Sequence, residues 1–501
     1  MSVRERNIGS NGDDGVSIAS SNSKVGLKKR VGLVAGISLI VGTMIGSGIF
    51  ISPKGVTRGS GSVGLSLISW SICGIISMFG ALSLAELGTM IPKSGCEYAY
   101  LLECYGGKEK YRSIGRIPAF LFNWVSMLLI KPSSIAIISL TCAEYVMVPF
   151  FDDGCGEPPT PNKKIMAALV IILLTAVNCF SVKLAARIQV VFTVAKLIAI
   201  AVIIIGGIVR LGQGQTAILA TGFTGTNKQV GKIAIGIYNG MWAYDGWNNL
   251  NYVTEEIINP NVNLPRSILI GIPLVTVCYL LVNISYFTVM TPAQLLDSTA
   301  VAIDFLKTFE GEIRYKMVLI SLLIAASAFG SINGSMFAAG RLFYVAGREG
   351  HMVEVMGMVH VKRNTPIPSL VFVSFIALLM IIPADIESLI DFFNFSAWIF
   401  YGLTMSALIV MRFTRKNEPR PYKVPIIIPI IVLIASCYLV VAPIIDDPRM
   451  EFLYASIFIV GGLFFYFPLV YFHKIPPFMA TVTAYLQLFF EIISPEAEAN
   501  D

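Results

Sequence analysis

Long apolar segments recur along almost the whole chain, and they constrain the fold more than any other feature of the sequence. Each is about 20 residues or longer, the length that an α-helix needs to cross the hydrocarbon core of a bilayer. Of the 501 residues, 55% are hydrophobic and only 14% are charged, whereas soluble domains carry about 25% charged residues. The sequence therefore predicts an all-α integral membrane protein.

Twelve segments have the length and apolar character of transmembrane helices. The predicted spans are residues 31–57, 64–91, 117–150, 165–183, 187–212, 231–258, 266–291, 316–346, 367–384, 387–412, 423–443 and 451–472. Residues 476–493 are apolar but shorter, and an acidic tail follows them. We expect this last segment to be an amphipathic helix at the membrane interface.

The distribution of Lys and Arg orients these spans. Residues 1–30 are polar, rich in Ser and Asn, and end in three basic residues. With this tail inside, the cytoplasmic segments hold clearly more Lys and Arg than the outer ones, as the positive-inside rule requires. We predict a disordered cytoplasmic tail at 1–30 and a cytoplasmic C-terminal tail at 473–501 that carries the interfacial helix. The net charge of +6 follows from this bias and does not indicate nucleic-acid binding.

Two of the predicted spans are interrupted near their middle. Residues 42–50 (GTMIGSGIF) break the first span, and residues 243–248 (AYDGWN) break the sixth. Lipid tolerates irregular backbone only where it is buried in protein or lines a water-filled cavity. Broken helices at matching positions of two repeats are typical of transporters that bind a ligand at the bilayer midplane.

The spacing of the two breaks also predicts an internal repeat. Residues 31–212 and 231–412 would each hold five spans, with the break in the first span of each unit. Two successive units with an odd number of spans must have inverted topology in the membrane. The predicted fold is therefore a 5+5 inverted repeat with broken helices 1 and 6, followed by two accessory helices within 423–472.

The two breaks suit opposite ends of an α-amino acid. Gly46, Ser47 and Gly48 lack bulky side chains, so a ligand can approach their backbone closely. Unwinding frees N–H groups and exposes the positive end of a half-helix, which attracts a carboxylate. The second break would offer carbonyls to an ammonium. Alternatively, glycines such as Gly42 and Gly46 only permit close packing of helices.

Asp245 is the most informative ionisable residue within the spans. A carboxylate inside a span is costly, so it must face a cavity or a partner. Asp245 can meet the side chain of a cationic substrate, or it can belong to a structural pair. Trp242 precedes it by three residues and can stack on a cation or close the site, although aromatic residues in spans more often serve packing.

Three further charges fall within or at the ends of predicted spans. Lys196 in the fifth span can occupy the place of a coupled sodium ion, which predicts sodium-independent transport, or it can brace the bundle. Lys131 precedes Pro132, where a kink leaves carbonyls that an ammonium can satisfy. Glu86 lies near the inner end of the second span, where we expect it to pair with a base.

No pattern for catalysis or metal binding stands out. The chain lacks a glycine-rich phosphate loop, which argues against ATP-driven pumping, and it lacks a clustered nucleophile–base pair. Its three histidines, His351, His360 and His473, are not spaced as metal ligands. We therefore predict no catalytic residue, no metal and no cofactor.

Cys155 differs from the other cysteines in its position. It lies within residues 151–159, in the outer loop after the third predicted span, whereas most of the others fall in spans. An exposed thiol on the oxidising face with no evident partner in the chain predicts an intermolecular disulfide. A free thiol and a bond within the chain are the alternatives.

Several motifs resemble those of one membrane protein family. They include residues 45–54 (IGSGIFISPK), 85–89 (AELGT), 93–95 (KSG), 253–256 (VTEE), 341–346 (RLFYVA) and 348–351 (REGH). On these motifs the chain resembles the light subunits of heterodimeric amino acid transporters, in the amino acid–polyamine–organocation superfamily, from about residue 31 to about residue 495. Residues 238–248 are most similar to the b(0,+)-type branch of that family.

This resemblance implies an activity and assigns residues to it. Cationic amino acids and cystine would enter the cell in obligatory, sodium-independent exchange for neutral amino acids. The alternatives are a large-neutral or y+L-type exchanger and an uncoupled carrier of cationic amino acids. Asp245 would contact a basic side chain, because neutral-selective relatives carry a small residue there. The residues that would hold the substrate backbone are Met44, Ile45, Gly46, Ser47 and Gly48.

The resemblance also implies a partner at the plasma membrane. Cys155 matches the position that bonds a single-span heavy-chain glycoprotein, of the rBAT-like or the CD98-heavy-chain-like kind. One stretch departs from the family, because residues 107–116 insert a basic segment where a tight Gly-Pro turn is usual. On the cytoplasmic side, this segment would be a solvated loop or would contact anionic lipid.

Overall fold

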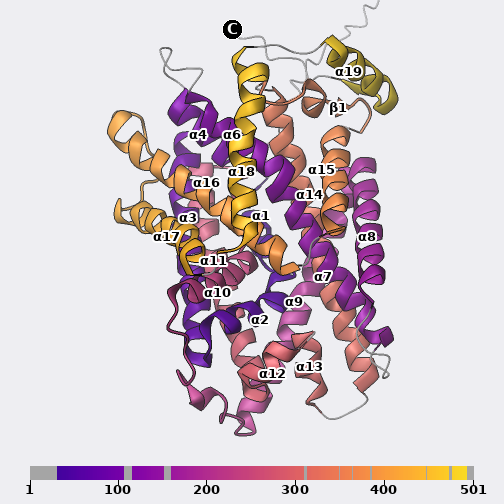
Figure 1. Cartoon of the computed structure of the whole chain (residues 1–501), viewed down its shortest axis with the longest axis vertical. Coiled ribbons are helices and arrows are strands. Elements are labelled where there is room, and N and C mark those ends of the chain that lie inside the picture. The colour runs from indigo at the N-terminus through magenta and orange to yellow at the C-terminus, as the bar shows by residue number, and fades with distance from the viewer. Residues whose placement is uncertain are drawn as a thin grey trace, which may run out of the picture.

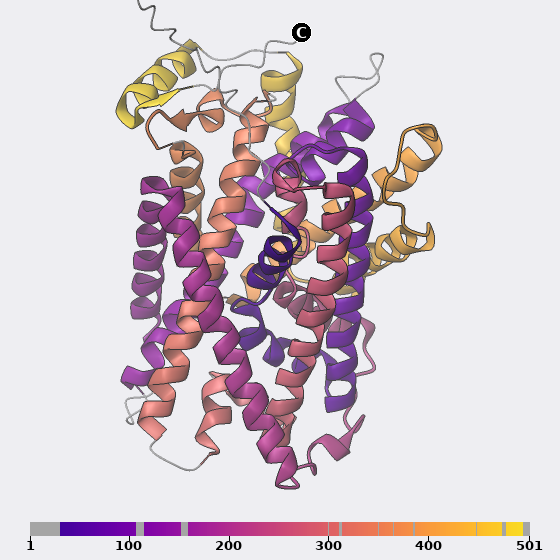
Figure 2. The same ribbon diagram turned by 180° about the vertical axis from the view of Figure 1, so that it is seen from behind.

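Apolar helices dominate the architecture, and most of them run along the long axis of the molecule (Figure 1). The computed structural model describes residues 31–106, 115–151, 159–298, 300–309, 313–348, 350–363, 365–383, 386–446, 448–472 and 477–493. The predicted N-terminal tail at 1–30 lies outside these ranges. The first two helices, α1 and α2, lie near the centre of the bundle in both views (Figure 1 and Figure 2).

The first half of the chain begins with a broken helix and continues with long helices. Its elements are α1 (Leu33–Met44), α2 (Gly48–Ser60), α3 (Val63–Met90), α4 (Glu97–Gly106), α6 (Ile117–Val125), the π-helical turn η2 (Ser126–Ile130), α7 (Lys131–Phe151), α8 (Thr160–Phe180), α9 (Val182–Gly212) and the short 3-10 helix η3 (Leu219–Thr221).

The second half again begins with an interrupted helix. Its elements are α10 (Val230–Ala243), the 3-10 helix η4 (Asn249–Glu256), α11 (Pro260–Val289), α12 (Pro292–Asp297), α13 (Val301–Lys307), α14 (Ile313–Arg348), the 3-10 helix η5 (Glu354–Gly357), β1 (Val359–His360), α15 (Ile367–Ile381), α16 (Ile386–Thr414), α17 (Ile427–Asp446), α18 (Met450–Phe465), the π-helical turn η6 (Tyr466–Tyr471), α19 (Pro477–Phe490) and β2 (Ile492–Ile493).

Ten of the predicted spans coincide with helices that can cross a membrane. Within the described residues, nine helices are long and apolar enough, and the pair α1 and α2, bent by 53°, makes a tenth. The predicted sixth and ninth spans fall on shorter helices, α10 with 14 residues and α15 with 15 residues. The structure is therefore that of a multi-pass membrane protein, while the total of twelve stays a prediction.

The outer surface of the bundle is apolar, as lipid contact requires. Large hydrophobic side chains are exposed along several helices, including Leu173 on α8, Ile205 on α9 and Leu274 on α11. A soluble protein rarely exposes extended apolar patches of this kind. The hydrophobic surface therefore agrees with the composition in placing most of the chain in lipid.

The C-terminal segment packs across one end of the bundle. There β2 pairs with β1 in antiparallel register, Val359 with Ile493 and His360 with Ile492. Tyr485, Leu488 and Phe489 of α19 project outward and are exposed. This apolar face agrees with an interfacial helix, which stays a prediction.

Glu86 fixes the end of α3 to the segment around the end of α16. Its buried carboxylate forms ion pairs with Arg412 and with Arg420, whose nitrogen lies 3.2 Å away. The same carboxylate accepts a hydrogen bond from Val424 N at 2.9 Å. The prediction that Glu86 pairs with a nearby base is confirmed.

Candidate functional site

The first break is a buried linker between α1 and α2. All five residues from Met44 to Gly48 are buried. Among the described residues, the N–H groups of Gly46 and Ser47 donate to no backbone carbonyl, and Ser47 Oγ has no hydrogen-bond partner. The break therefore holds polar groups that α1 and α2 leave unsatisfied.

The second break is a tight turn between α10 and the 3-10 helix η4. Gly246 takes a backbone φ of +102°, a conformation that only glycine adopts at low cost. The chain resumes a helical path at Asn249, in the narrower 3-10 form. Both interruptions therefore lie within the predicted intervals.

The two breaks lie against each other. A Cβ on Gly48 would lie 2.5 Å from Ala243 Cα, so the backbones of α2 and α10 are in direct contact there. Tyr279 of α11 spans the junction, because its hydroxyl oxygen lies 2.6 Å from Met44 O and 2.8 Å from Ala243 O, and its single proton can be donated to either carbonyl. The sequence contained no signal for Tyr279, since a tyrosine inside a span is ordinary.

A small cavity borders the second break, and we call it the central cavity. It is lined by Phe122, Ser126, Ile130, Lys131, Ser134, Asp245, Tyr252, Phe393, Ala397 and Tyr401. Its volume is about 10 Å³, room for about one water molecule. An amino acid can therefore enter only when the surrounding helices move apart.

Asp245 and Lys131 both face this cavity. Among the described residues, the Asp245 carboxylate forms no ion pair, although it interacts with the N–H of Gly246 and feels the charge of Lys131. The Lys131 ammonium lies 4.9 Å from the centre of the Tyr252 ring. It donates to no backbone carbonyl of the described chain, so the predicted carbonyl role of Lys131 is wrong. The ammonium instead lies over the Tyr252 ring.

The predicted residues of the first break do not line the central cavity. Met44 to Gly48 are buried beside it, because direct contact between Gly48 and Ala243 leaves no space between the breaks. A Cβ on Gly46 would likewise lie 2.8 Å from Ser331 Oγ. The packing alternative, stated for Gly42 and Gly46, agrees with this close contact at Gly46, whereas a Cβ on Gly42 would meet Thr193 Oγ1 at an ordinary 3.4 Å.

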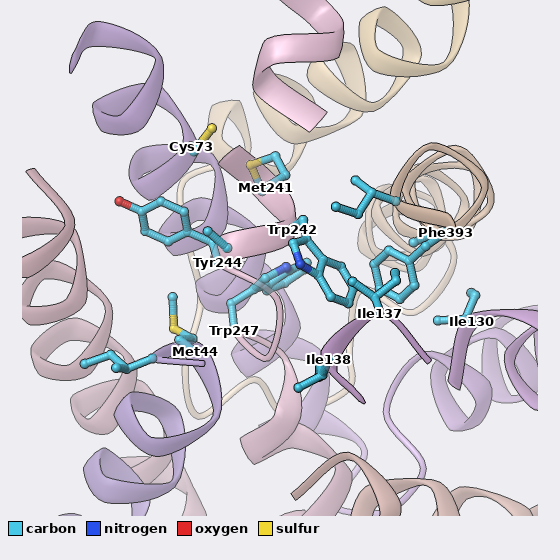
Figure 3. Close-up of a cluster of buried hydrophobic side chains, with 14 of the residues drawn as sticks. Met44, Cys73, Ile130, Ile137, Ile138, Met241, Trp242, Tyr244, Trp247 and Phe393 are labelled. Carbon is cyan, nitrogen blue, oxygen red and sulfur yellow. The ribbon is translucent and has the colours of Figure 1, made fainter. Parts of the chain in front are cut away.

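Trp242 packs against a residue that lines the central cavity. Its ring meets Phe393 edge-on with centroids 4.9 Å apart, and Phe393 lines the cavity. Figure 3 shows the Trp242 ring beside Phe393, with Trp247 behind it. Trp247 packs edge-on against Tyr401, a second lining residue, at 4.9 Å. The two tryptophans that flank Asp245 therefore both pack on aromatic residues of the cavity lining.

Lys196 is fully buried where α9 meets the first break. Its ammonium donates to Gly42 O at 2.7 Å and to Ser331 Oγ at 3.4 Å. The charge therefore holds the last turn of α1 against α9 and α14. This geometry accommodates both predicted roles, a brace and a fixed cation in place of sodium.

Glu97 is a buried carboxylate that sequence reasoning did not single out. It starts α4, and its Oε1 accepts a hydrogen bond from Asn248 Nδ2 of the second break at 2.6 Å. Its Oε2 is buried without a hydrogen-bond partner. The preceding residues Gly95 and Cys96 take φ values of +110° and +49° and turn the chain toward the break. This contact connects positions 151 residues apart, and no local pattern marks it.

Two predicted features lie outside the described residues. They are Cys155 and most of the basic insertion, residues 107–114. The cysteines that the structure describes are all free thiols, and those in the core, such as Cys73 and Cys142, are buried packing residues.

Comparison with known proteins assigns this geometry to a family. A family model described as amino acid permease matches residues 31–470. The chain belongs to the amino acid permease family. It is an amino acid transporter of the membrane and not an enzyme.

Individual relatives cover nearly the whole length of this permease. The chain is 52% identical over 475 residues to the b(0,+)-type amino acid transporter 1 of Mus musculus, covering 94% of each protein. It is 39% identical to the cystine/glutamate transporter of Pongo abelii, over 94% of the chain and 92% of the relative. It is 40% identical to the large neutral amino acids transporter small subunit 2 of Homo sapiens, over 98% and 90%.

Proposed function

We propose that this permease is a sodium-independent antiporter that brings cationic amino acids and cystine into the cell in exchange for neutral amino acids. It would work by alternating access, in a bundle of twelve spans built as a 5+5 inverted repeat. The b(0,+)-type relative at 52% identity supports this cargo within the family.

The observation that carries the proposal is the environment of Asp245. Asp245 lines the central cavity, and no Lys or Arg of the described chain forms an ion pair with it. A carboxylate at membrane depth costs several kcal/mol unless a partner or water compensates it. A cationic substrate supplies that partner, so Asp245 favours a guanidinium or ammonium over an aliphatic side chain.

Lys131 extends this argument to cystine. Cystine carries a second ammonium and a second carboxylate at its far end. The central cavity presents an anion at Asp245 and a cation at Lys131, one for each of these groups. Arginine would use only Asp245, and a neutral amino acid would use neither charge.

The first break would hold the substrate's α-carboxylate once the helices part. The unsatisfied N–H groups of Gly46 and Ser47 are the available donors there, and they precede the positive end of α2. Lys196 would supply the fixed charge that other transporters obtain from sodium, because its ammonium already holds the carbonyl of Gly42.

A single-span heavy-chain glycoprotein is the proposed partner at the plasma membrane. One relative is described as a small subunit, which agrees with assembly with a second chain. Cys155 would form the disulfide to that chain, of the rBAT-like or CD98-heavy-chain-like kind. Both termini would be cytoplasmic, which places Cys155 on the outer face.

Substitution of Asp245 tests the proposal. We expect Asp245→Asn to reduce arginine exchange at least about tenfold, since a charged hydrogen bond contributes about 1.5–3 kcal/mol, while leucine exchange persists. Asp297→Asn is the matched control, because Asp297 is exposed and does not line the cavity. Uptake of both amino acids is measured in proteoliposomes. Equal loss of arginine and leucine exchange in Asp245→Asn would contradict the role of Asp245 in selectivity.

A further inference from the structure

A second and larger cavity lies between α2, α10, α16 and the start of α18. Its volume is about 260 Å³, and we call it the outer cavity. The residues on which the argument depends are Arg58, Lys232, Asn239, Glu387, Asp391 and Arg449. In the proposed topology all of these positions lie near the outer face, because they follow the first span and begin the sixth, tenth and twelfth.

The outer cavity shares helix α16 with the central cavity and is also lined by α10, which leads to Asp245. Asn239 and Trp242 are one turn apart on α10, and Asp391 precedes Phe393 on α16. Trp242 and Phe393 pack against each other with ring centroids 4.9 Å apart. Phe393 also lines the central cavity. Along both helices, this aromatic pair follows residues that line the outer cavity, Asn239 on α10 and Asp391 on α16.

Three cations and two anions line the outer cavity, and they are paired unequally. Asp391 is buried and forms an ion pair with Arg449 at 2.5 Å. Arg58 pairs with Glu387 at 2.7 Å, but both side chains are more than half exposed. Lys232 is exposed and forms no ion pair with any described residue. The lining of the outer cavity therefore carries one uncompensated positive charge, that of Lys232.

The exposure and the ion pairing of these side chains decide which of them can bind a ligand. A buried pair such as Asp391–Arg449 is costly to open, because opening leaves a charge unpaired. An exposed pair such as Arg58–Glu387 is weak, so a ligand ammonium can compete for Glu387 at little cost. Lys232 is free to receive a carboxylate. A space of about 260 Å³, equal to roughly eight waters of liquid, accommodates one amino acid.

We propose that the outer cavity is a first-contact site that binds external amino acids before they pass Trp242. Lys232 receives the α-carboxylate, and Glu387 receives the α-ammonium. The site recognises the head group that all amino acids share, whereas selection among side chains occurs at Asp245. This inference rests on the proposed exchange and on the proposed orientation.

Lys232→Gln tests the site when KM is measured separately for external and for internal amino acid. We expect KM for external leucine to rise about fivefold, the factor for one exposed ion contact, with Vmax and KM for internal leucine unchanged. The rise in KM for external arginine should be smaller, because the loss of Lys232 also removes a positive charge that repels the cationic side chain of arginine. Lys232→Arg keeps the charge and should restore the wild-type KM.

Lys228→Gln is the matched control, since Lys228 is an exposed lysine four residues earlier, before the start of α10, and does not line the outer cavity. Its KM should equal that of the wild type. An unchanged external KM in Lys232→Gln would overturn the first-contact site, as would an equal rise in Lys228→Gln or for internal leucine. Failure of the wild type to exchange amino acids would instead overturn the proposed function.

Discussion

At the residue scale, two carboxylates within the bundle differ in their ion pairing. Glu86 is compensated by Arg412, Arg420 and a backbone N–H, all from the protein itself. Asp245 faces a cavity and has no ion pair in the described chain. Burying a charge is tolerable when the protein pairs it. An intramembrane charge that the protein leaves unpaired points to a ligand.

Replacing Glu86 should therefore affect stability more than selectivity. Glu86→Gln leaves Arg412 and Arg420 without their buried anion, which should cost about 3–5 kcal/mol of unfolding free energy. Glu387→Gln removes an exposed partner of Arg58 and should cost less than about 1 kcal/mol. Thermal unfolding of the purified protein in detergent measures both. Equal melting temperatures for the two variants would contradict the structural role of Glu86.

Lys131 should distinguish cystine from arginine. Lys131→Met removes the cation that would meet the second carboxylate of cystine, so cystine exchange should fall at least about tenfold. Arginine exchange should persist or strengthen, because its partner Asp245 loses a competing charge. Lys131→Arg is the control that keeps the cation. If cystine exchange survives in Lys131→Met, the proposed contact with cystine is wrong.

At the element scale, the two broken helices behave as one unit. Gly48 packs directly on Ala243, and the Tyr279 hydroxyl lies within hydrogen-bond distance of a carbonyl at each break. Movement of one broken helix must therefore displace the other. This coupling suits a site that opens and closes as a whole.

Adding one methyl group at this contact should impair the protein. A Cβ at position 48 would meet the Ala243 backbone at 2.5 Å, so Gly48→Ala should cost about 1–3 kcal/mol through overpacking and slow exchange. Gly42→Ala is the control, because its Cβ would lie 3.4 Å from Thr193 Oγ1, an ordinary contact. Folded yield and leucine exchange measure both variants. Equal folded yield and equal leucine exchange in the two variants would show that the contact at Gly48 does not constrain the two breaks.

The positions of the breaks could be predicted from the sequence, but their conformations could not. Gly46, Gly48 and Gly246 mark where helix propensity fails. The π-helical turn at Ser126–Ile130 and the 3-10 form of η4 arise in segments without such local marks. The Glu97–Asn248 contact depends on the tertiary fold. Sequence reasoning therefore found Asp245, and missed Tyr279 and Glu97.

At the scale of the whole molecule, the two ends of the path differ. At the proposed cytoplasmic end, Val31 before α1 is tied to η4, since Val31 N donates to Glu256 O at 2.9 Å. The Glu256 side chain also pairs with Arg341 of α14 at 2.9 Å. At the opposite end, the outer cavity is lined by exposed side chains such as Arg58 and Glu387. Contacts that tie the helices at one end and an exposed cavity at the other agree with the proposed alternating access.

Obligatory exchange is the central claim for the molecule as a whole, and trans-stimulation tests it most directly. Proteoliposomes that contain the chain with its heavy subunit are loaded with leucine or left empty, and uptake of labelled arginine is followed with and without sodium. We predict rapid uptake into leucine-loaded vesicles, little uptake into empty ones, and no effect of sodium. Equal uptake into loaded and empty vesicles, or uptake that requires sodium, would contradict the account.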